Sequence, residues 1–537
     1  MKQLLTILLI MGALGARAQR HPAPPPPPDA PQQLARAELL LDPDLDEVQV
    51  QALPADTAVV LLIRHQAPGQ RQVRYAFQRY GLQLRLRDEQ AVEIPAEFEL
   101  RRMCSEPGVV YALFSALDGK GRLLAAAYDV RGGLVRVQAF DTKLTRQVGA
   151  LKALNGRLLA NVSLSDDQHQ TVLLLNVANG KFQFLPTVYE PLNSELTSVA
   201  DRPGRRAEFV LSQSNGRKQR LMVKRLSAEQ GELLNSETVQ TESERSLLTA
   251  QLSPPADTTT RLLAGTYALR DVQYAQGLFA TDLTKPTNAT ASKSALRFYD
   301  FRRLRHFFDY LNPAHEARLR DRADRREARA AAPIHWRYHL LLHELLPQPG
   351  GGYTLVAEVY TPQYTYPSNY GNGMFTPMAA GLASGARSFG TPGGYYGGGR
   401  VLLGFRTSHV LVCGFDKRGG LLWDNTYVVT PDVVRSALEE AVQPLTLADG
   451  RVVLAYLNTE NELHYKCINQ SEAGDNDRQV PLLTYSTDGK TPDKVLDTSQ
   501  PELMPWAENQ FVASGFQRVR SGQGPERQVF FLQALRF

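Results

Sequence analysis

Short apolar runs separated by turn residues recur along most of the chain. In the clearest copies the run ends at a polar residue or a glycine, a turn rich in Gly, Asn or Asp follows, and a second alternating run begins. The first four copies end at Gly81, Asp129, Asn176 and Arg225, which are 48, 47 and 49 residues apart. Such runs predict strands joined by hairpins. A period near 48 residues holds about four strands, which is the size of one propeller blade.

Weaker copies follow at 278–282, 410–416 and 465–469, and the chain ends on a further apolar run at 529–532. We therefore predict an all-β fold, a seven- or eight-bladed β-propeller-like repeat. Because closure of the ring removes exposed strand edges, we expect residues near 46–52 to cover the edge of the last blade. The predicted blades occupy 34–290 and 334–537.

The period changes from two to 3.6 between Ser294 and Ala332. This change predicts a helical insertion at 291–333, with a second helix starting after Pro313. Residues 297–337 contain eleven Arg and six acidic residues. The segment is either a cationic arm for an anionic envelope surface or a nucleic acid, or a solvated helix with i,i+4 pairs such as Asp321–Arg325. We favour the solvated helix and expect no nucleic-acid partner.

A Gly/Tyr-rich loop at 361–400 interrupts the repeat a second time. Long loops inside a compact domain are often functional, and tyrosine buries contact area at small entropic cost. The loop therefore predicts a binding surface for an envelope protein or a glycan, with a low-complexity flap as an equal alternative. The predicted binding residues are Tyr364, Tyr366, Tyr370, Tyr395 and Tyr396.

The N-terminus has the features of a cleaved secretory signal at 1–18. Lys2 precedes an apolar run from Leu4 to Leu14, and Ala16-Arg17-Ala18 has the small-x-small pattern of a cleavage site. The apolar run is too short to span a bilayer, which needs about 20 residues. Residues 19–33 contain five consecutive prolines and predict a polyproline spacer. We expect an exported monomer, periplasmic or extracellular, without a transmembrane anchor.

Composition agrees with a folded chain that carries no cysteine framework. The 537 residues contain 60 Lys and Arg and 55 Asp and Glu, so the formal charge of +5 is spread over a balanced surface. The three cysteines, Cys104, Cys413 and Cys467, form no C-x-x-C pair and are expected to be free thiols.

The search for catalytic and metal motifs is negative. No nucleophile elbow, P-loop or H-E-x-x-H motif occurs. His335, His339 and His343 have helical metal-ligand spacing, but apolar residues alternate with them. We interpret this segment as a strand, on which neighbours at i and i+4 lie about 13 Å apart, too far to share an ion. We predict no catalytic residue, no metal ion and no cofactor.

The segment 416–423 ends a blade with Asp416, a Gly419-Gly420 turn and Trp423. It resembles the blade signature of quinoprotein-like and WD-type propellers, and Asn176, Gly180 and Phe184 resemble a version with Phe in place of Trp. The layout is also similar to that of secreted bacterial proteins with strand, helix and strand segments. The resemblance implies the fold rather than a quinone cofactor, because none of the family's pocket residues can be placed on this chain.

Two function classes remain open. The first is a non-enzymatic secreted or periplasmic scaffold that binds a protein or glycan through the insertions in one blade. The second is a propeller-type hydrolase or lyase acting on an envelope or extracellular polysaccharide, whose catalytic groups come from separate blades. Paired carboxylates in a closed pocket would favour the enzyme, and a Tyr-rich patch would favour binding.

Overall fold

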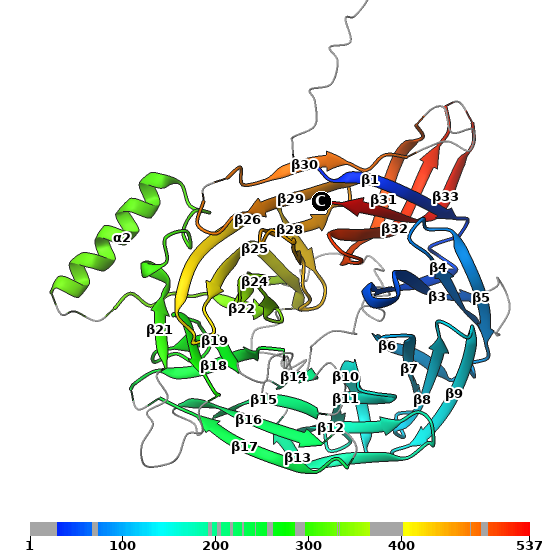
Figure 1. Ribbon diagram of the computed structural model, residues 1–537, viewed down its shortest axis with the longest axis horizontal. Helices are drawn as coiled ribbons and strands as arrows, with labels where there is room; N and C mark the ends of the chain where they lie inside the picture. The colour runs from blue at the N-terminus through cyan, green and yellow to red at the C-terminus, as the bar shows by residue number, and fades with distance from the viewer. Residues whose placement is uncertain are drawn as a thin grey trace, which may run out of the picture.

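The computed structural model of the chain shows eight β-sheets arranged around one axis (Figure 1). It describes residues 29–537 apart from 67–72, 192–195, 201–205, 215–217, 228–229, 242, 255–260, 285–295, 330, 332, 366–400, 473, 485–491 and 523. Each sheet is antiparallel, and in all but one its strands run in sequence order from the axis outward, as β6 to β9 illustrate in Figure 1; the exception is the last sheet, whose outer strand is β1. The predicted all-β fold is confirmed, with eight blades.

The first four blades follow one another with short connections. Blade 1 consists of β2 (Asp46–Leu53), β3 (Ala58–Gln66), β4 (Val73–Tyr80) and β5 (Leu86–Val92), with the 3-10 turn η1 (Pro54–Asp56) between β2 and β3. Blade 2 consists of β6 (Phe98–Glu106), β7 (Val109–Ala116), β8 (Arg122–Asp129) and β9 (Leu134–Asp141). Blade 3 consists of β10 (Thr145–Ala153), β11 (Arg157–Leu164), β12 (His169–Asn176) and β13 (Phe182–Pro191). Blade 4 consists of β14 (Leu196–Ala200), β15 (Arg206–Ser214), β16 (Gln219–Ser227) and β17 (Leu233–Val239).

The second half of the ring is less regular. Blade 5 consists of β18 (Ser246–Leu252), β19 (Leu262–Ala268), β20 (Gly277–Asp282) and β21 (Arg297–Asp300). Blade 6 consists of β22 (His339–Leu342), β23 (Leu346–Pro347), β24 (Tyr353–Thr365), β25 (Val401–Phe415) and β26 (Leu421–Arg435). Blade 7 consists of β27 (Gln443–Thr446), β28 (Val452–Leu457), β29 (Glu462–Ile468) and β30 (Arg478–Pro481). Blade 8 consists of β31 (Lys494–Pro505), β32 (Gln510–Arg520), β33 (Glu526–Arg536) and β1 (Gln32–Leu39).

The sequence repeat marks the third strand of each blade. Asp129 and Asn176 are the last residues of β8 and β12, and the later copies fall on β20, β25, β29 and β33. The polar residue recurs because its side chain holds the hairpin to the fourth strand. Oδ1 of Asp416 accepts hydrogen bonds from the backbone N–H groups of Arg418 and Gly420 at 2.8 and 2.7 Å.

The ring is closed by β1, not by residues 46–52, so that expectation was wrong. β1 pairs antiparallel with β33 and forms the outer strand of blade 8 (Figure 1). Residues 46–53 instead form β2, which pairs with β3 across the short connection 54–57. A local hairpin closes a much shorter loop than pairing with the far end of the chain does, which explains this choice. β1 starts at Gln32, within the segment predicted as a spacer.

Only the second of the two helices predicted for the insertion is present among the described residues. The first predicted helix is wrong: residues 297–300 form β21, residues 301–303 form the 3-10 turn η2 (Phe301–Arg303), and the following residues are irregular. Its phenylalanines serve as core, since Phe301, Phe307 and Phe308 are fully buried between blades 5 and 6. Tertiary burial therefore overrode the helical spacing.

The second predicted helix is α2 (Pro313–Ala328), which lies outside the ring (Figure 1). Asn312 caps it by accepting hydrogen bonds from the N–H groups of Ala314 and His315. Asp321 and Arg325 form an ion pair at 2.6 Å, as the solvated-helix interpretation expects.

Neighbouring blades are held together by apolar clusters. Between blades 1 and 2, Phe77 stacks on Tyr128 with ring centroids 5.2 Å apart, and Val60 and Val110 are fully buried beside them. The three cysteines are free, as expected. No helix among the described residues has the length and apolarity that a bilayer crossing requires.

Candidate functional site

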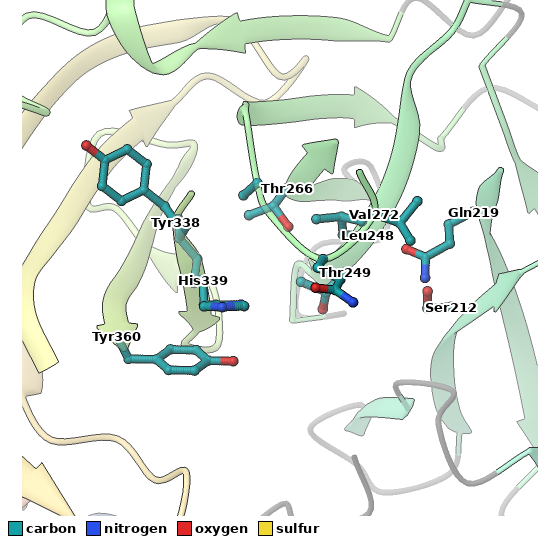
Figure 2. A pocket seen from close by; sticks show the side chains of 12 residues that line it. Ser212, Gln219, Leu248, Thr249, Thr266, Val272, Tyr338, His339 and Tyr360 are labelled. Atoms are coloured by element: carbon teal, nitrogen blue, oxygen red, sulfur yellow. The ribbon is translucent and has the colours of Figure 1, made fainter. Parts of the chain in front are cut away.

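A pocket of about 170 Å³ lies where blades 4, 5 and 6 meet (Figure 2). We call it the blade 4–6 pocket. Its walls come from β15 and β16 of blade 4, from β18, β19 and the 269–276 connection of blade 5, and from the start of β22 and the outer part of β24 of blade 6. It therefore lies at the blade face where β24 leads into the predicted binding loop and β25 returns from it.

Buried backbone contacts fix the blade 6 wall against blade 5. The Gln276 side chain donates to the carbonyl of Trp336 at 2.8 Å and accepts from the Trp336 N–H at 2.9 Å. Ala275 and Tyr338 form a β-bridge, and Gln251 donates to the carbonyl of Leu342 at 3.1 Å. The segment that carries His339 is thus held on both sides, so the pocket wall is preorganised.

Aromatic rings form one wall of the pocket. His339 and Tyr360 are cross-strand partners on β22 and β24, and their rings stack with centroids 5.4 Å apart and an interplanar angle of 24°. Tyr274 packs on the same imidazole, with centroids 4.9 Å apart. Figure 2 shows the His339 and Tyr360 side chains side by side, both projecting into the opening. The Tyr338 ring points away and bonds through its hydroxyl to Tyr310.

The setting of His339 favours its neutral form. Desolvation by burial lowers the pKa of its imidazole, against the opposing effects of the Asp271 carboxylate and of a hydrogen bond with the Gln273 backbone. A neutral imidazole that donates one N–H to a backbone carbonyl keeps an acceptor lone pair on its other nitrogen. His339 therefore offers an acceptor to a ligand in the pocket.

The opposite wall is polar and uncharged. Thr249 and Thr266 are 8% and 1% exposed, and Ser212 is 7% exposed, so these hydroxyl groups sit in a largely dry environment. Gln219 adds an amide (Figure 2). Each hydroxyl can donate one hydrogen bond and accept others, and the amide does both. Among the twelve described residues that line the pocket none is Asp, Glu, Lys or Arg.

The structure describes one of the five predicted binding tyrosines. Tyr364 lies near the end of β24, four positions beyond Tyr360, and is 50% exposed. Tyr366, Tyr370, Tyr395 and Tyr396 lie outside the described residues. The predicted loop thus starts from the strand that supplies Tyr360.

His335, His339 and His343, which have helical metal-ligand spacing in the sequence, lie in three different environments. Residues 339–342 form a strand, which confirms that interpretation for His339, whereas His335 and His343 lie outside the strand. His335 is exposed, His339 faces the pocket, and His343 is buried and bonds to Glu358 at 2.9 Å. Within the described ranges, no three His, Cys, Asp or Glu side chains are grouped so that they would hold a metal ion.

Sequence reasoning did not identify the pocket. The alternation over 335–343 and 353–360 predicts a hairpin, and a correct register would have paired His339 with Tyr360. Thr249 and Thr266 belong to another blade, and no local pattern connects them with β22. Their meeting depends on the packing of blades 5 and 6.

Comparison with known proteins identifies no family. No family model matches the chain, and no curated protein matches it. Among solved structures, a prolyl endopeptidase is 9% identical over 88% of this chain and 55% of its own, with a TM-score of 0.39. Prolyl oligopeptidase B from Galerina marginata is 10% identical over 88% of this chain and 56% of its own, with a TM-score of 0.38.

A cobalt-substituted apocarotenoid oxygenase from Synechocystis is 8% identical over 47% of this chain and 64% of its own, with a TM-score of 0.29. The chain thus spans about half the length of the prolyl peptidase structures that it matches. At these scores and identities the resemblances carry no argument about activity, substrate or cofactor.

Proposed function

We propose that this protein is an exported β-propeller scaffold that binds a glycan of the cell envelope or the extracellular space through blade 6. The observation that carries the proposal is the blade 4–6 pocket, in which the His339 and Tyr360 rings face the hydroxyl groups of Thr249 and Thr266. Export rests on the predicted signal at 1–18.

The chemistry of the two walls supports a glycan. A sugar ring presents C–H groups on its faces and hydroxyl groups around its edge. Aromatic side chains supply rigid apolar area for the faces, and hydroxyl and amide groups fix the orientation of the edge. The pocket combines both kinds of group and adds the acceptor nitrogen of His339.

The size of the pocket favours a glycan over a protein partner. Stable protein interfaces bury about 1,200–2,000 Å² of surface. A pocket of about 170 Å³ receives one ring or one side chain instead. The exposed Tyr364 at the end of β24 is available for further units of a chain.

The polysaccharide hydrolase or lyase is the less supported alternative. Glycoside hydrolysis uses two carboxyl groups about 5 to 9.5 Å apart on either side of the bond. The described lining of this pocket offers neutral hydrogen-bonding groups and rings. These groups suit retention of a sugar, and binding is therefore the function that we propose.

The test is retention of polysaccharides by the mature protein, residues 19–537. The immobilised protein is exposed to fragmented envelope polysaccharides and, separately, to envelope proteins freed of glycan. Retention of polysaccharide alone supports the proposal. Retention of protein alone, or of nothing, contradicts it.

The contribution of the loop tyrosines is tested by a deletion. Replacing Thr365 to Tyr396 by a short glycine bridge removes Tyr366, Tyr370, Tyr395 and Tyr396. We expect thermal unfolding to stay nearly unchanged and capture of polysaccharide to be lost. A variant that unfolds shows that the loop is structural, and one that captures as the intact protein does shows that these four tyrosines are not the binding surface.

A further inference from the structure

Beyond the general proposal, we infer that the blade 4–6 pocket holds a single neutral sugar unit, packed beside the stacked His339–Tyr360 ring pair and hydrogen-bonded by His339, Thr249 and Thr266, and that it rejects anionic sugars. This inference rests on the proposed function and names the chemistry of its ligand.

The volume limits the ligand to one ring. Pockets for drug-sized ligands measure about 300–1,000 Å³. The blade 4–6 pocket has about 170 Å³ and is walled by three blades, so an oligosaccharide would place one unit inside and the others outside.

The absence of cationic groups from the described lining decides the charge of the ligand. Burying a carboxylate without a counter-charge is costly. The charged side chain that acts on His339 is Asp271, which would repel an anion. The anionic group of a uronic acid or a sulfated sugar would thus lose its hydration without gaining a cationic partner. A neutral or N-acetylated sugar carries no charge and does not pay this desolvation cost.

The hydrogen-bonding groups match a polyhydroxylated ring. His339 provides an acceptor, and Thr249 and Thr266 provide hydroxyl groups that donate and accept. Thr249 and Thr266 are more than nine-tenths buried and line the pocket. In such sites a ligand lacking the matching hydroxyl leaves buried polar groups unpaired, which gives strong discrimination.

The experiment is isothermal titration of the mature protein with monosaccharide probes. The neutral probes are methyl glucoside, methyl galactoside and N-acetylglucosamine, and the anionic probes are glucuronic and galacturonic acid. We expect at least one neutral probe to bind at least tenfold more tightly than both anionic ones. Equal or tighter binding of an anionic probe overturns the inference.

Variants locate the binding in the pocket. Tyr360→Ala should weaken the best neutral probe at least tenfold, whereas Tyr360→Phe keeps the ring and should stay within about twofold. Thr266→Val should weaken it about tenfold. Thr281→Val is the matched control, because Thr281 is equally buried on β20 of the same blade, has an unpartnered hydroxyl and does not line the pocket.

The pH profile tests the role of His339. Asp271, Tyr274 and Tyr360 are the titratable groups that face this imidazole. Since burial lowers the pKa of His339, affinity should stay within twofold from pH 8 to pH 6. A loss of more than twofold over this range would indicate an imidazole that is not desolvated and would contradict the assigned role.

The outcomes separate this inference from the proposed function. If polysaccharide is retained while Tyr360→Ala and Thr266→Val bind normally, the glycan site lies elsewhere and only the inference is wrong. If neither polysaccharide nor any probe binds, the proposed function is wrong as well. Near-ultraviolet circular dichroism of each variant establishes that a loss of binding is not a loss of fold.

Discussion

Blades 2 and 6 have the same strand order but different interiors. In blade 2, most residues of the central strands β7 and β8 are buried and apolar. Residues 98–141, which form this blade, contain no histidine. Blade 6 buries Glu358, Thr407 and His409 on its central strands, and Asp424 beside them. One fold thus tolerates an apolar and a polar interior. The polar blade is the one that carries the insertion and the pocket wall.

The polar interior of blade 6 is centred on Glu358, which is fully buried. Its carboxylate accepts hydrogen bonds from the N–H groups of Ala441 and Val442 at 2.8 and 3.0 Å and from the Thr407 hydroxyl at 3.1 Å. His343 Nε2 lies 2.9 Å from it. This network connects β24 of blade 6 to the segment that enters blade 7. Blade 2, in contrast, contacts its neighbouring blades through apolar clusters.

The largest expected effect follows removal of this carboxylate. Glu358→Leu should lower the free energy of unfolding by about 3–5 kcal/mol, because two backbone N–H groups, a hydroxyl and His343 lose their partner in a buried site. Urea unfolding followed by tryptophan fluorescence measures the loss. Glu358→Gln should cost less, since its carbonyl oxygen still accepts.

The control for that comparison is Glu99→Gln on β6 of blade 2. Glu99 is one-third exposed and pairs with Arg101 at 2.9 Å, so the expected change is within about 0.5 kcal/mol. Equal losses in Glu358→Leu and Glu99→Gln would show that the buried network of blade 6 does not contribute to stability.

A second prediction concerns acid. Burial lowers the pKa of His409 in blade 6 to about 3, so the folded protein keeps this imidazole neutral below pH 6.5, where the unfolded chain binds a proton. The unfolded state then binds more protons, and stability falls as pH decreases from 6.5 toward 3. Between pH 7 and pH 5 this single group should remove about 2 kcal/mol.

His409→Phe tests the assignment. The phenyl ring replaces an imidazole that stacks on Tyr310 with centroids 4.0 Å apart, and it cannot titrate. Urea unfolding at pH 7 and pH 5 should show a smaller acid loss in the variant, by about 2 kcal/mol. An unchanged difference would assign the acid sensitivity to other groups.

The sequence predicts regular blades better than it predicts blade 6. The 48-residue spacing located the third strand of the first four blades, and weaker copies of the same run located those of blades 5 to 8. It missed the first half of the helical insertion, where Phe301 and Phe307 fill the core between two blades. It also missed ring closure by β1 and the pocket at His339, since both depend on pairing between distant segments.

A third, more local effect is expected at the attachment of α2 to the ring. Arg320 donates to the carbonyls of Arg302, Leu304 and Arg305 at 2.6, 3.0 and 2.9 Å, and its guanidinium lies over the Phe308 ring. Arg320→Ala should destabilise this attachment by about 1.5–3 kcal/mol, the range for hydrogen bonds to charged groups. Hydrogen exchange should quicken in α2 and remain unchanged in blade 2.

Arg325→Ala is the matched change on the same helix. Arg325 is mostly exposed and pairs only with helix residues among those described, so the expected loss is about 0.3–0.5 kcal/mol. If the two variants exchange at the same rate, Arg320 does not anchor the helix. The attachment would then depend on Asp424, which accepts hydrogen bonds from the backbone N–H groups of Arg305 and His306 in the segment before α2.

The smallest expected loss of stability concerns the hairpin after the third strand, which blades 2 and 6 share, and it should be equal in the two blades. Asp129 ends the third strand of blade 2 and Asp416 follows that of blade 6, and each accepts two turn N–H groups. Asp129→Ala and Asp416→Ala should each cost about 1 kcal/mol in urea unfolding, and the Asn variants almost nothing, because Asn176 serves in blade 3. The N–H groups of Gly132 and Arg131 lower the pKa of Asp129, so its contribution is present above the unfolded value near 3.9 and is lost as pH falls through the lower folded value. Unequal losses in the two alanine variants would mean that blade 6 departs from blade 2 in its turns as well as in its interior.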